Sequence, residues 1–350
     1  MRYLKKAIED MQTQKVVCWG AGRRLKHFLD TYCGPGKLLP KPDFICDSTR
    51  TVGDSEYVIP SVTLEQLIEM NPEQTTIIVT AGLFDLQAQI IPSELYYFPL
   101  YHRRSFEMLH FLENEKQKLE EVLGMLADEK SKEVYQNVFN AILDGSFIRQ
   151  SLYTRSAYFG NDLIATLPNN STVAFAGAFN GKHIERALRN NSSTRFHAFE
   201  PNKKWYTFLC DKFRNNNAIN IYNRILWKDT TTLAFDGDSL NHGLDAHVAG
   251  TADIGNTGLD AVQTTTIDAI DDDTVSMIIL DVEGSEANAL DGARQTIAQK
   301  HPVLAVCLYH EMEDFINLPF KIASLATKPY QLHVRHHSVI SAIETVLYAL

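Results

Sequence analysis

The second half of the chain alternates between short β-rich runs and segments with helical spacing, and this alternation limits the fold most. The expected strands lie at residues 171–176, 194–199, 219–223, 275–280, 302–308, 330–335 and 345–349. The expected helices lie at residues 181–190, 202–215, 285–300 and 314–326. Strands and helices that alternate in this way predict a parallel sheet covered by helices on both faces.

The segment 229–266 interrupts the alternation. It is polar, contains Gly and Asp, and holds only short β-like pieces such as "TTLAF" and "AVQTTT". Long connections inside a compact domain are often functional. We therefore expect an insertion, which could lie over a ligand site as a lid.

The first 101 residues carry a shorter series of the same kind. The runs "KVVCWG", "PDFICD" and "TTIIVTAG" indicate strands, and a segment with helical spacing follows the first of them. Thr63 stands three residues before Gln66, which predicts a capping box at a helix start. The sequence therefore predicts a small parallel sheet in a Rossmann-like domain.

A dinucleotide-binding fingerprint in this first domain is incomplete. Gly20 and Gly22 match the opening of G-x-G-x-x-G, but Leu25 stands where the third Gly would be. Asp47 could bind a ribose, and the arginine pair after Gly22 could meet a phosphate. A structural or recognition domain explains these residues equally well, and a nucleotide-sensing scaffold is a further alternative.

Residues 103–150 differ from both series, because apolar residues recur there at helical spacing between Glu- and Lys-rich positions. These apolar residues are Leu119, Val122, Leu123, Leu126, Val134, Val138 and Ile142. The pattern predicts a pair of amphipathic helices between two domains. We expect a Rossmann-like domain at residues 1–101, a helical linker at 102–165 and a second α/β domain at 166–350. The helices could also form an oligomer interface.

Composition excludes some classes of partner. The net charge is −10, which disfavours nonspecific binding to nucleic acid or to anionic membranes. No apolar run approaches the length of a membrane span. The five cysteines are odd in number, and no pair has metal-ligand spacing. Together with a start that lacks an apolar signal core, this predicts a cytoplasmic protein with reduced thiols.

Polar residues follow the expected strands of the second domain, where ligands bind in open parallel sheets. They are the loop Gly177-Ala178-Phe179-Asn180-Gly181, Glu200, the run from Asp281 through Glu283 to Glu286, His310, and the pair His336–His337. Each has a plain structural explanation as a turn, a helix cap or an incidental histidine. Their shared position at one edge predicts a single site. Glu200 also lies 23 residues after Gly177, close to the spacing of about 20 for an acid that binds ribose.

From about residue 130 to 350 the chain resembles the FkbM-type methyltransferases, which are class I S-adenosylmethionine-dependent O-methyltransferases. The resemblance rests on "SAYFGNDLIATL", "GAFNGKHI", "FEPN", "TTTIDAI", "ILDVEGSEANALDGA", "HPVLAVCLYHEMEDFINLPFKI" and "VRHHS". It implies a seven-stranded sheet with an antiparallel last strand. It also implies S-adenosylmethionine as the methyl donor and a hydroxyl acceptor, such as one on a sugar, a glycan or another small hydroxylated metabolite.

The resemblance also implies roles for individual residues. Gly177, Ala178, Asn180 and Gly181 would surround the methionine part of the cofactor, Glu200 would bind its ribose, and Asp281 would face the methyl group. Glu283, His310 and His337 would lie nearer the acceptor. We expect His310 to act as the catalytic base, with Asp281 as the second candidate. These acids and histidines could also ligate a metal, but no short ligand motif supports that, so no metal is expected.

Phe175 departs from the family pattern, which usually has Asp at this position. Loss of one charge-assisted hydrogen bond costs about 1.5–3 kcal/mol, which weakens cofactor binding without removing the pocket. A catalytically degenerate protein that binds a glycan intermediate or a protein partner is therefore the alternative. The first domain resembles the Rossmann-like accessory domains of some sugar-modifying methyltransferases and acyltransferases, which favours a glycan or a nucleotide-linked sugar as substrate.

Overall fold

The computed structural model describes most of the chain, which divides into two compact units. The described residues are 12–20, 25–26, 29–30, 33–36, 40–46, 58–79, 95–97, 115–144, 150–236, 247–250, 259–270, 272, 274–338 and 344–350. The first unit comprises residues 1–114 and 139–148, and the second comprises residues 115–138 and 149–350. The domain boundaries expected from the sequence stay a prediction.

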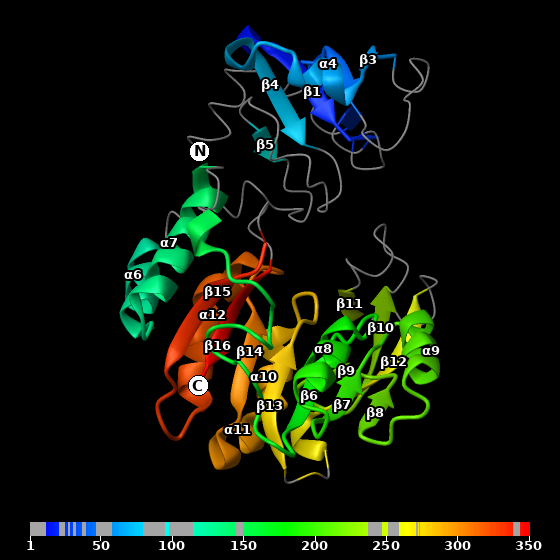
Figure 1. The fold of residues 1–350 in the computed structure, drawn as a ribbon, viewed down its shortest axis with the longest axis vertical. Coiled ribbons are helices and arrows are strands. Elements are labelled where there is room, and N and C mark those ends of the chain that lie inside the picture. The colour runs from blue at the N-terminus through cyan, green and yellow to red at the C-terminus, as the bar shows by residue number, and fades with distance from the viewer. Residues whose placement is uncertain are drawn as a thin grey trace. The chain divides into compact units, whose positions relative to one another are not determined.

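The first unit contains a five-stranded parallel sheet in the order β3-β2-β1-β4-β5 (Figure 1). Its strands are β1 (Lys15–Trp19), β2 (Phe44–Cys46), β3 (Ser61–Val62), β4 (Thr75–Val79) and β5 (Leu95–Tyr97). This arrangement confirms the Rossmann-like architecture. Gly22, the arginines at 23 and 24, and Asp47 lie outside the described residues, so their proposed nucleotide contacts stay a prediction.

A short helix, α4 (Leu64–Ile68), begins with the capping box that the sequence predicts. The Thr63 hydroxyl accepts a hydrogen bond from the Gln66 backbone N–H at 3.2 Å, and the Gln66 side chain accepts one from the Thr63 N–H at 2.9 Å. A 3-10 turn, η1 (Pro72–Gln74), follows. Leu67 of α4 packs with Val17, Trp19, Cys46 and Ile77 in the core of this unit.

The second unit is built on a seven-stranded sheet in the order β15-β16-β14-β13-β6-β7-β8 (Figure 1). Its strands are β6 (Thr172–Ala176), β7 (Arg195–Phe199), β8 (Ile219–Tyr222), β13 (Val275–Leu280), β14 (Val303–Cys307), β15 (Leu332–His336) and β16 (Thr345–Ala349). Only β16 runs antiparallel to its two neighbours, and the other pairs are parallel. The sheet therefore confirms the predicted seven strands with an antiparallel last one.

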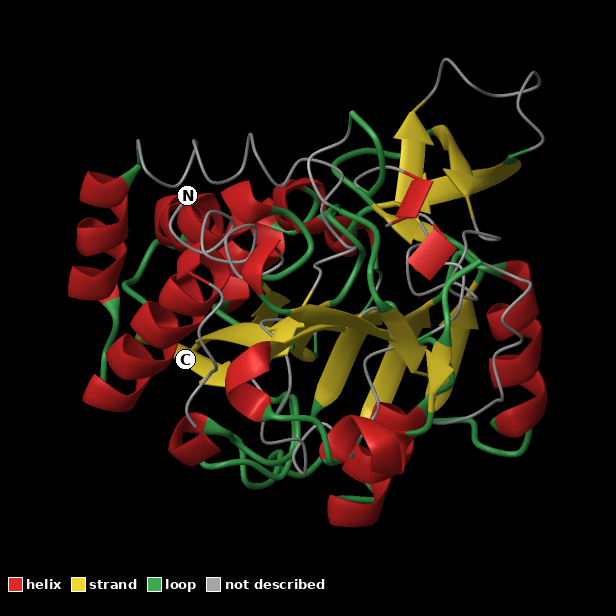
Figure 2. Cartoon of the chain, turned by 90° about the horizontal axis from the view of Figure 1, so that it is seen from above, coloured by secondary structure: helices red, strands yellow, loops and turns green. Residues whose placement is uncertain are grey.

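Helices lie on both sides of this sheet (Figure 2). They are α8 (Lys182–Asn190), α9 (Lys203–Lys212), α10 (Glu286–Asp291), α11 (Arg294–Lys300) and α12 (Met312–Leu325). The sequence predicts one helix where α10 and α11 form two. A Cβ on Gly292 would lie 1.9 Å from the Trp227 carbonyl oxygen, so the chain packs tightly there, and Ala293 leaves the helical region.

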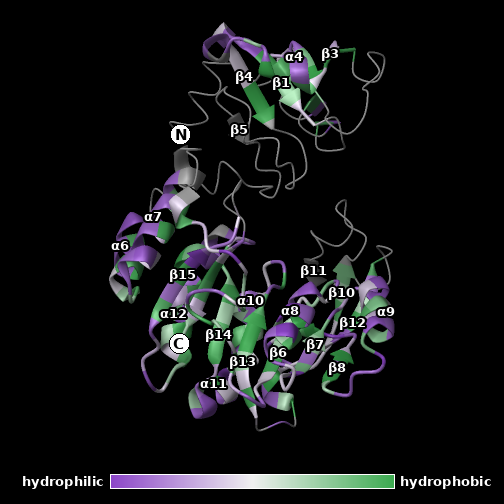
Figure 3. Ribbon diagram, viewed as in Figure 1, coloured by the Kyte–Doolittle hydropathy of each residue, from purple (hydrophilic) through white to green (hydrophobic). Residues whose placement is uncertain are grey.

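Alternate residues of the central strands form the core on one side of the sheet. They include Phe175 of β6, Ile279 of β13, Cys307 of β14 and Tyr348 of β16. Figure 3 shows these strands as the most apolar part of the unit. Side chains alternate along a strand, so every second residue has the same orientation. The next residue in each series is Gly177 after β6, Asp281 after β13 and Tyr309 after β14. The core pattern thus brings three polar or glycine positions to one edge.

The predicted insertion, together with β9 just before it, forms a second, four-stranded sheet in the order β11-β10-β12-β9. Its strands are β9 (Ile225–Leu226), β10 (Thr232–Asp236), β11 (His247–Gly250) and β12 (Asp260–Thr265), and η4 (Ile267–Ala269) follows. Ile225, Leu233, Phe235 and Val262 form its core. A lid role for this sheet stays a prediction.

The predicted pair of amphipathic helices corresponds to α6 (Lys116–Met125) and α7 (Glu129–Asp144). The Tyr135 hydroxyl donates to the Phe315 carbonyl oxygen at 2.7 Å, and the two rings stack. After η3 (Gln150–Leu152), residues 153–170 form turns and bends up to the start of β6. Among the described helices, none combines the length and the apolar character that a membrane crossing needs.

Candidate functional site

The loop after β6 needs glycine at both of its ends. Gly177 has φ +80°, and a Cβ there would lie 1.8 Å from the Asp281 carbonyl oxygen. Gly181 has φ +71°, directly before α8, and a Cβ there would lie 2.7 Å from the Phe213 ring. A larger residue would therefore be strained and would clash at either position. The N–H groups of Gly177 and Ala178 donate to the Phe199 carbonyl oxygen at 3.0 and 3.2 Å, which ties the loop to β7.

Glu200 follows β7 and holds the same loop from the other side. Its Oε2 accepts a hydrogen bond from the Phe179 N–H at 2.8 Å, and its Oε1 accepts one from the Asn202 N–H at 2.9 Å. The residue is only 5% exposed. Burial raises the pKa of the Glu200 carboxyl from 4.5 to about 7, although the two backbone donors lower it. Each carboxylate oxygen retains a further lone pair with which it can accept a ligand hydroxyl.

Asn180 stabilises the start of α8. Its side-chain oxygen accepts from the Lys182 N–H at 3.1 Å, and its carbonyl oxygen accepts from the Lys212 ammonium at 2.8 Å. Before it, Phe179 has φ +47°, and its ring centroid lies 4.2 Å from that of Trp205. The predicted loop residues thus lie together, with their backbone fixed by hydrogen bonds and ring packing.

Asp281 follows β13 and is held by two tyrosines. Its Oδ2 accepts from the Tyr158 hydroxyl at 2.8 Å, and its Oδ1 accepts from the Tyr309 hydroxyl at 3.0 Å. The Asp281 N–H donates to the Ala176 carbonyl oxygen at 3.2 Å, beside Gly177. The structure therefore places Asp281 directly against the glycine loop.

His310 lies among carboxylates. Its Nδ1 lies 2.7 Å from Glu286 Oε1, and its Nε2 lies 3.4 Å from Asp281 Oδ1 and 3.6 Å from Glu283 Oε2. Burial by itself lowers the pKa of the His310 imidazole, but the nearby carboxylates, led by Glu283 and Glu286, raise it well above 6.5. The ring is therefore positively charged at neutral pH. Asp281, Glu283 and His310 come together as the sequence predicts.

His337 lies in a different network. Its Nδ1 is 2.7 Å from the Thr154 carbonyl oxygen, and its Nε2 is 2.9 Å from the Tyr348 hydroxyl. Because a carbonyl oxygen can only accept, Nδ1 carries the proton and Nε2 accepts from Tyr348. Burial lowers the pKa of His337 to about 4, so the ring is neutral. Its ring nitrogens thus bond to residues 154 and 348, and substrate binding by His337 stays a prediction.

The sequence alone assigned no role to four residues at this edge. Tyr158 lies inside "SAYFGNDLIATL", Tyr309 precedes His310, and Glu286 ends the "DVEGSE" run. The fourth is Glu344, which comes just before the antiparallel strand β16. The Leu308 N–H donates to the Thr345 carbonyl oxygen, so Glu344 comes opposite Tyr309. Burial raises the pKa of Glu344, and the Asp281 charge adds to this.

Phe175 lies inside β6 and is 1% exposed. Its ring meets the rings of Tyr158 and His183 edge-on, with centroids 5.7 and 6.3 Å away. Burial lowers the pKa of His183 to about 3, so that ring is neutral. Position 175 therefore belongs to an uncharged aromatic group. Within the part of the chain that the structure describes, no three His, Cys, Asp or Glu residues are arranged to hold a metal ion.

The strand order, the single antiparallel strand, the glycine loop after β6 and the acid after β7 together define a class I methyltransferase architecture. Residues 176–343 match the sequence profile of the Methyltransferase FkbM domain. Residues 176–343 of the second unit therefore form an FkbM methyltransferase domain.

One solved structure shows a similar fold over the whole chain. The methyltransferase FkbM from Methylobacillus flagellatus KT is similar over 100% of this chain and 94% of its own, with a TM-score of 0.71 and 18% identity. The precorrin-6y C5,15-methyltransferase from Geobacter metallireducens GS-15 aligns with 52% of this chain and 80% of its own, with a TM-score of 0.31 and 11% identity. No curated protein matches the chain.

Proposed function

We propose that this protein is an S-adenosylmethionine-dependent O-methyltransferase that acts on a hydroxyl of a sugar, a glycan or another small hydroxylated metabolite. One observation carries the proposal. The buried Glu200 carboxylate is hydrogen-bonded to Phe179 of the glycine loop, at the edge where the parallel strands end. A carboxylate beside such a loop is suited to a nucleoside with free ribose hydroxyls.

The residues at this edge fit the cofactor. Gly177 and Gly181 would let the backbone approach the methionine part, and N–H groups in the first turn of α8 would face its carboxylate. Glu200 has acceptor positions left for two ribose hydroxyls. When bound, S-adenosylmethionine supplies an electrophilic methyl group on its sulfonium.

Asp281 and His310 would manage the acceptor. A catalytic base must be free to accept a proton, and the raised pKa of His310 keeps that ring protonated at neutral pH. This favours the second candidate, Asp281, as the group that orients the acceptor hydroxyl and receives its proton. His310 then acts as a charged hydrogen-bond donor, and Glu283, 3.6 Å from it, contacts the acceptor.

A second candidate function rests on Phe175. The family carboxylate is absent there, and the buried aromatic ring offers no hydrogen bond to a cofactor ammonium. A protein that binds a glycan intermediate or a partner without catalysis would have this feature.

Calorimetric titration of the whole protein with S-adenosylmethionine and S-adenosylhomocysteine separates the two functions. We expect binding, and we expect Glu200→Gln to weaken it about tenfold or more, because one acceptor oxygen is replaced by a donor. Glu129→Gln is the control, since the Glu129 side chain is 82% exposed in α7. Absence of binding in the wild-type protein would reject the enzyme and favour the second candidate.

The acceptor class needs its own assay. Tritium transfer from labelled S-adenosylmethionine to a panel of free sugars, nucleotide-linked sugars and glycans should label one of the classes on oxygen. Label that survives mild base distinguishes a methyl ether from a methyl ester. A product methylated on nitrogen or carbon would contradict the proposed hydroxyl acceptor.

A further inference from the structure

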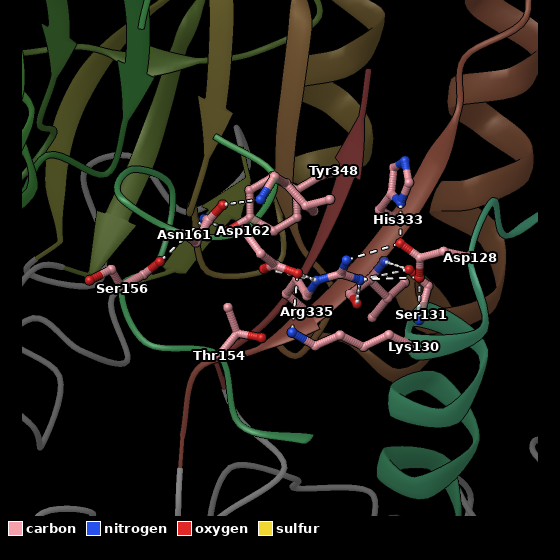
Figure 4. Close-up of polar contacts among 12 residues, drawn as sticks. Asp128, Lys130, Ser131, Thr154, Ser156, Asn161, Asp162, His333, Arg335 and Tyr348 are labelled. Atoms are coloured by element: carbon pink, nitrogen blue, oxygen red, sulfur yellow. Dashed lines mark hydrogen bonds and ion pairs between the residues drawn. The ribbon is translucent and has the colours of Figure 1, made fainter. Parts of the chain in front are cut away.

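Residues 150–170 form a strap that is pinned to strand β15. The buried Arg335, 3% exposed, donates to both carboxylate oxygens of Asp162 in the strap, at 3.1 and 2.9 Å. On its other side Arg335 donates to Asp128, before α7, at 2.9 Å (Figure 4). The Thr154 N–H donates to the His336 carbonyl oxygen at 2.8 Å. The strap is therefore held at two points along β15.

Between these points, the strap is fixed against β16. Asn161 accepts hydrogen bonds from the N–H groups of Leu163 and Ile164, and its amide donates to the Tyr348 hydroxyl at 3.3 Å. The Tyr158 N–H donates to the same hydroxyl at 3.0 Å. Tyr348 therefore fixes the backbone of Tyr158, which has the left-handed φ of +64°.

This backbone position aims the Tyr158 side chain at the site. Its ring packs edge-on against His183 at 4.9 Å and Phe175 at 5.7 Å, and its hydroxyl reaches Asp281 Oδ2 at 2.8 Å. The same hydroxyl lies 3.3 Å from Cys307 Sγ. Burial and the Asp281 charge raise the pKa of Tyr158 well above 10, so the phenol keeps its proton and remains a donor.

We infer that Tyr158 is a positioning residue for the Asp281 carboxylate. The Tyr348 hydroxyl fixes the backbone of Tyr158, and the rings of Phe175 and His183 fix its side chain. Tyr158 and Tyr309 each occupy one Asp281 oxygen, so the carboxylate cannot rotate without breaking a bond. Because Asp281 lies against Gly177, whose loop is proposed to hold the methionine part of the cofactor, the orientation of Asp281 also affects binding of the amino-acid end of the cofactor. The inference rests on the proposed cofactor site.

Phe175 gains an explanation from this arrangement. Its ring packs edge-on against Tyr158, and an Asp there would remove that contact and place a carboxylate in a buried aromatic environment. The polar group that orients the site comes from the strap instead of from β6. Phe175 and Tyr158 are therefore coupled positions, and Phe175 does not by itself indicate a degenerate site.

The test compares two ligands by calorimetry. S-adenosylhomocysteine has an amino-acid end, whereas 5′-methylthioadenosine lacks it. We expect Tyr158→Phe to raise the Kd of S-adenosylhomocysteine about tenfold and that of methylthioadenosine less than about twofold. In the Asp281→Asn background, Tyr158→Phe should add nothing further, because it acts through Asp281. Equal losses for both ligands, or an equal loss in both backgrounds, would overturn the inference.

Tyr135→Phe is the matched control. Tyr135 is as buried as Tyr158 and also donates one hydrogen bond, to the Phe315 carbonyl oxygen away from the loop. It should lower thermal stability by a similar amount and leave both Kd values unchanged. If the wild-type protein binds neither ligand, the proposed function fails. In that case, urea unfolding still tests whether Tyr158 acts on Asp281. The measurement compares the Tyr158→Phe and Asp281→Asn single variants with the double variant. Non-additive midpoint shifts support the pairing of the two residues, and additive shifts reject it.

Discussion

The substitution Glu200→Gln should stabilise the protein above neutral pH while weakening its ligand binding. Glu200 is almost completely buried, and burial raises the pKa of its carboxyl from 4.5 to about 7. Between these two pH values the folded state holds a proton that the unfolded state has lost. Stability therefore falls as pH rises through this window.

The magnitude follows from the size of the shift. One unit of pKa difference corresponds to about 1.4 kcal/mol, so ionisation of Glu200 costs the folded state about 3 kcal/mol once the pH is above 7. A Gln at this position stays neutral and has no such cost. It does lose one acceptor toward the N–H of Phe179 or Asn202, an offset of about 1 kcal/mol that is present at every pH.

Urea unfolding at about pH 5 and about pH 8 measures this difference directly, with tryptophan fluorescence as the signal. The stability of Glu200→Gln relative to the wild type should rise by about 2.5 kcal/mol from the lower to the higher pH, because part of the cost is already present at pH 5. Glu129→Gln should follow the wild type at both values. Parallel curves for the wild type and Glu200→Gln would refute the reasoning, because Glu200 would then titrate alike in the folded and unfolded states.

Three further substitutions test the geometry of the second unit. Gly177→Ala should abolish ligand binding and lower stability by several kcal/mol in urea unfolding, because its Cβ would lie 1.8 Å from a backbone oxygen; a wild-type midpoint would contradict this. Arg335→Met should lower the free energy of unfolding by about 3–5 kcal/mol at neutral pH. The loss should be smaller in acid, because the arginine lowers the pKa of Asp128 and Asp162 and its contribution disappears once these carboxylates are protonated. A loss that does not change with pH would count against the ion pairs. Phe175→Asp should weaken S-adenosylhomocysteine binding and lower the thermal midpoint; tighter binding would mean that the loop lacks only the family carboxylate.

The strands and the acid at the end of β7 could be predicted because both depend on local sequence. Apolar alternation locates β6, β13 and β14 within a residue or two, and strand ends in a parallel sheet meet at one edge. The grouping of Asp281, Glu283 and His310 follows from the same rule.

The missed features depend on contacts between distant segments. Tyr158 lies 123 positions from Asp281 in sequence, in a stretch without helical or strand periodicity, so no local pattern indicates their hydrogen bond. The protonation of His310 depends on its distances to Glu283 and Glu286, which the sequence does not contain. The break between α10 and α11 likewise depends on the Trp227 carbonyl, which packs against Gly292.

The position of β16 in the sheet links the end of the chain to the site. This strand lies between β14 and β15 but follows both of them in sequence, so these two strands do not pair with each other and are joined only through β16. Tyr348, which fixes the backbone of Tyr158, lies on this strand, as does the pairing that brings Glu344 to Tyr309. A truncated chain that stops before Thr345 would retain Glu200, Asp281 and His310 and still lack a set orientation for Asp281. The orientation of Asp281 by Tyr158 therefore depends on the last strand of the chain, although β16 supplies none of the predicted site residues.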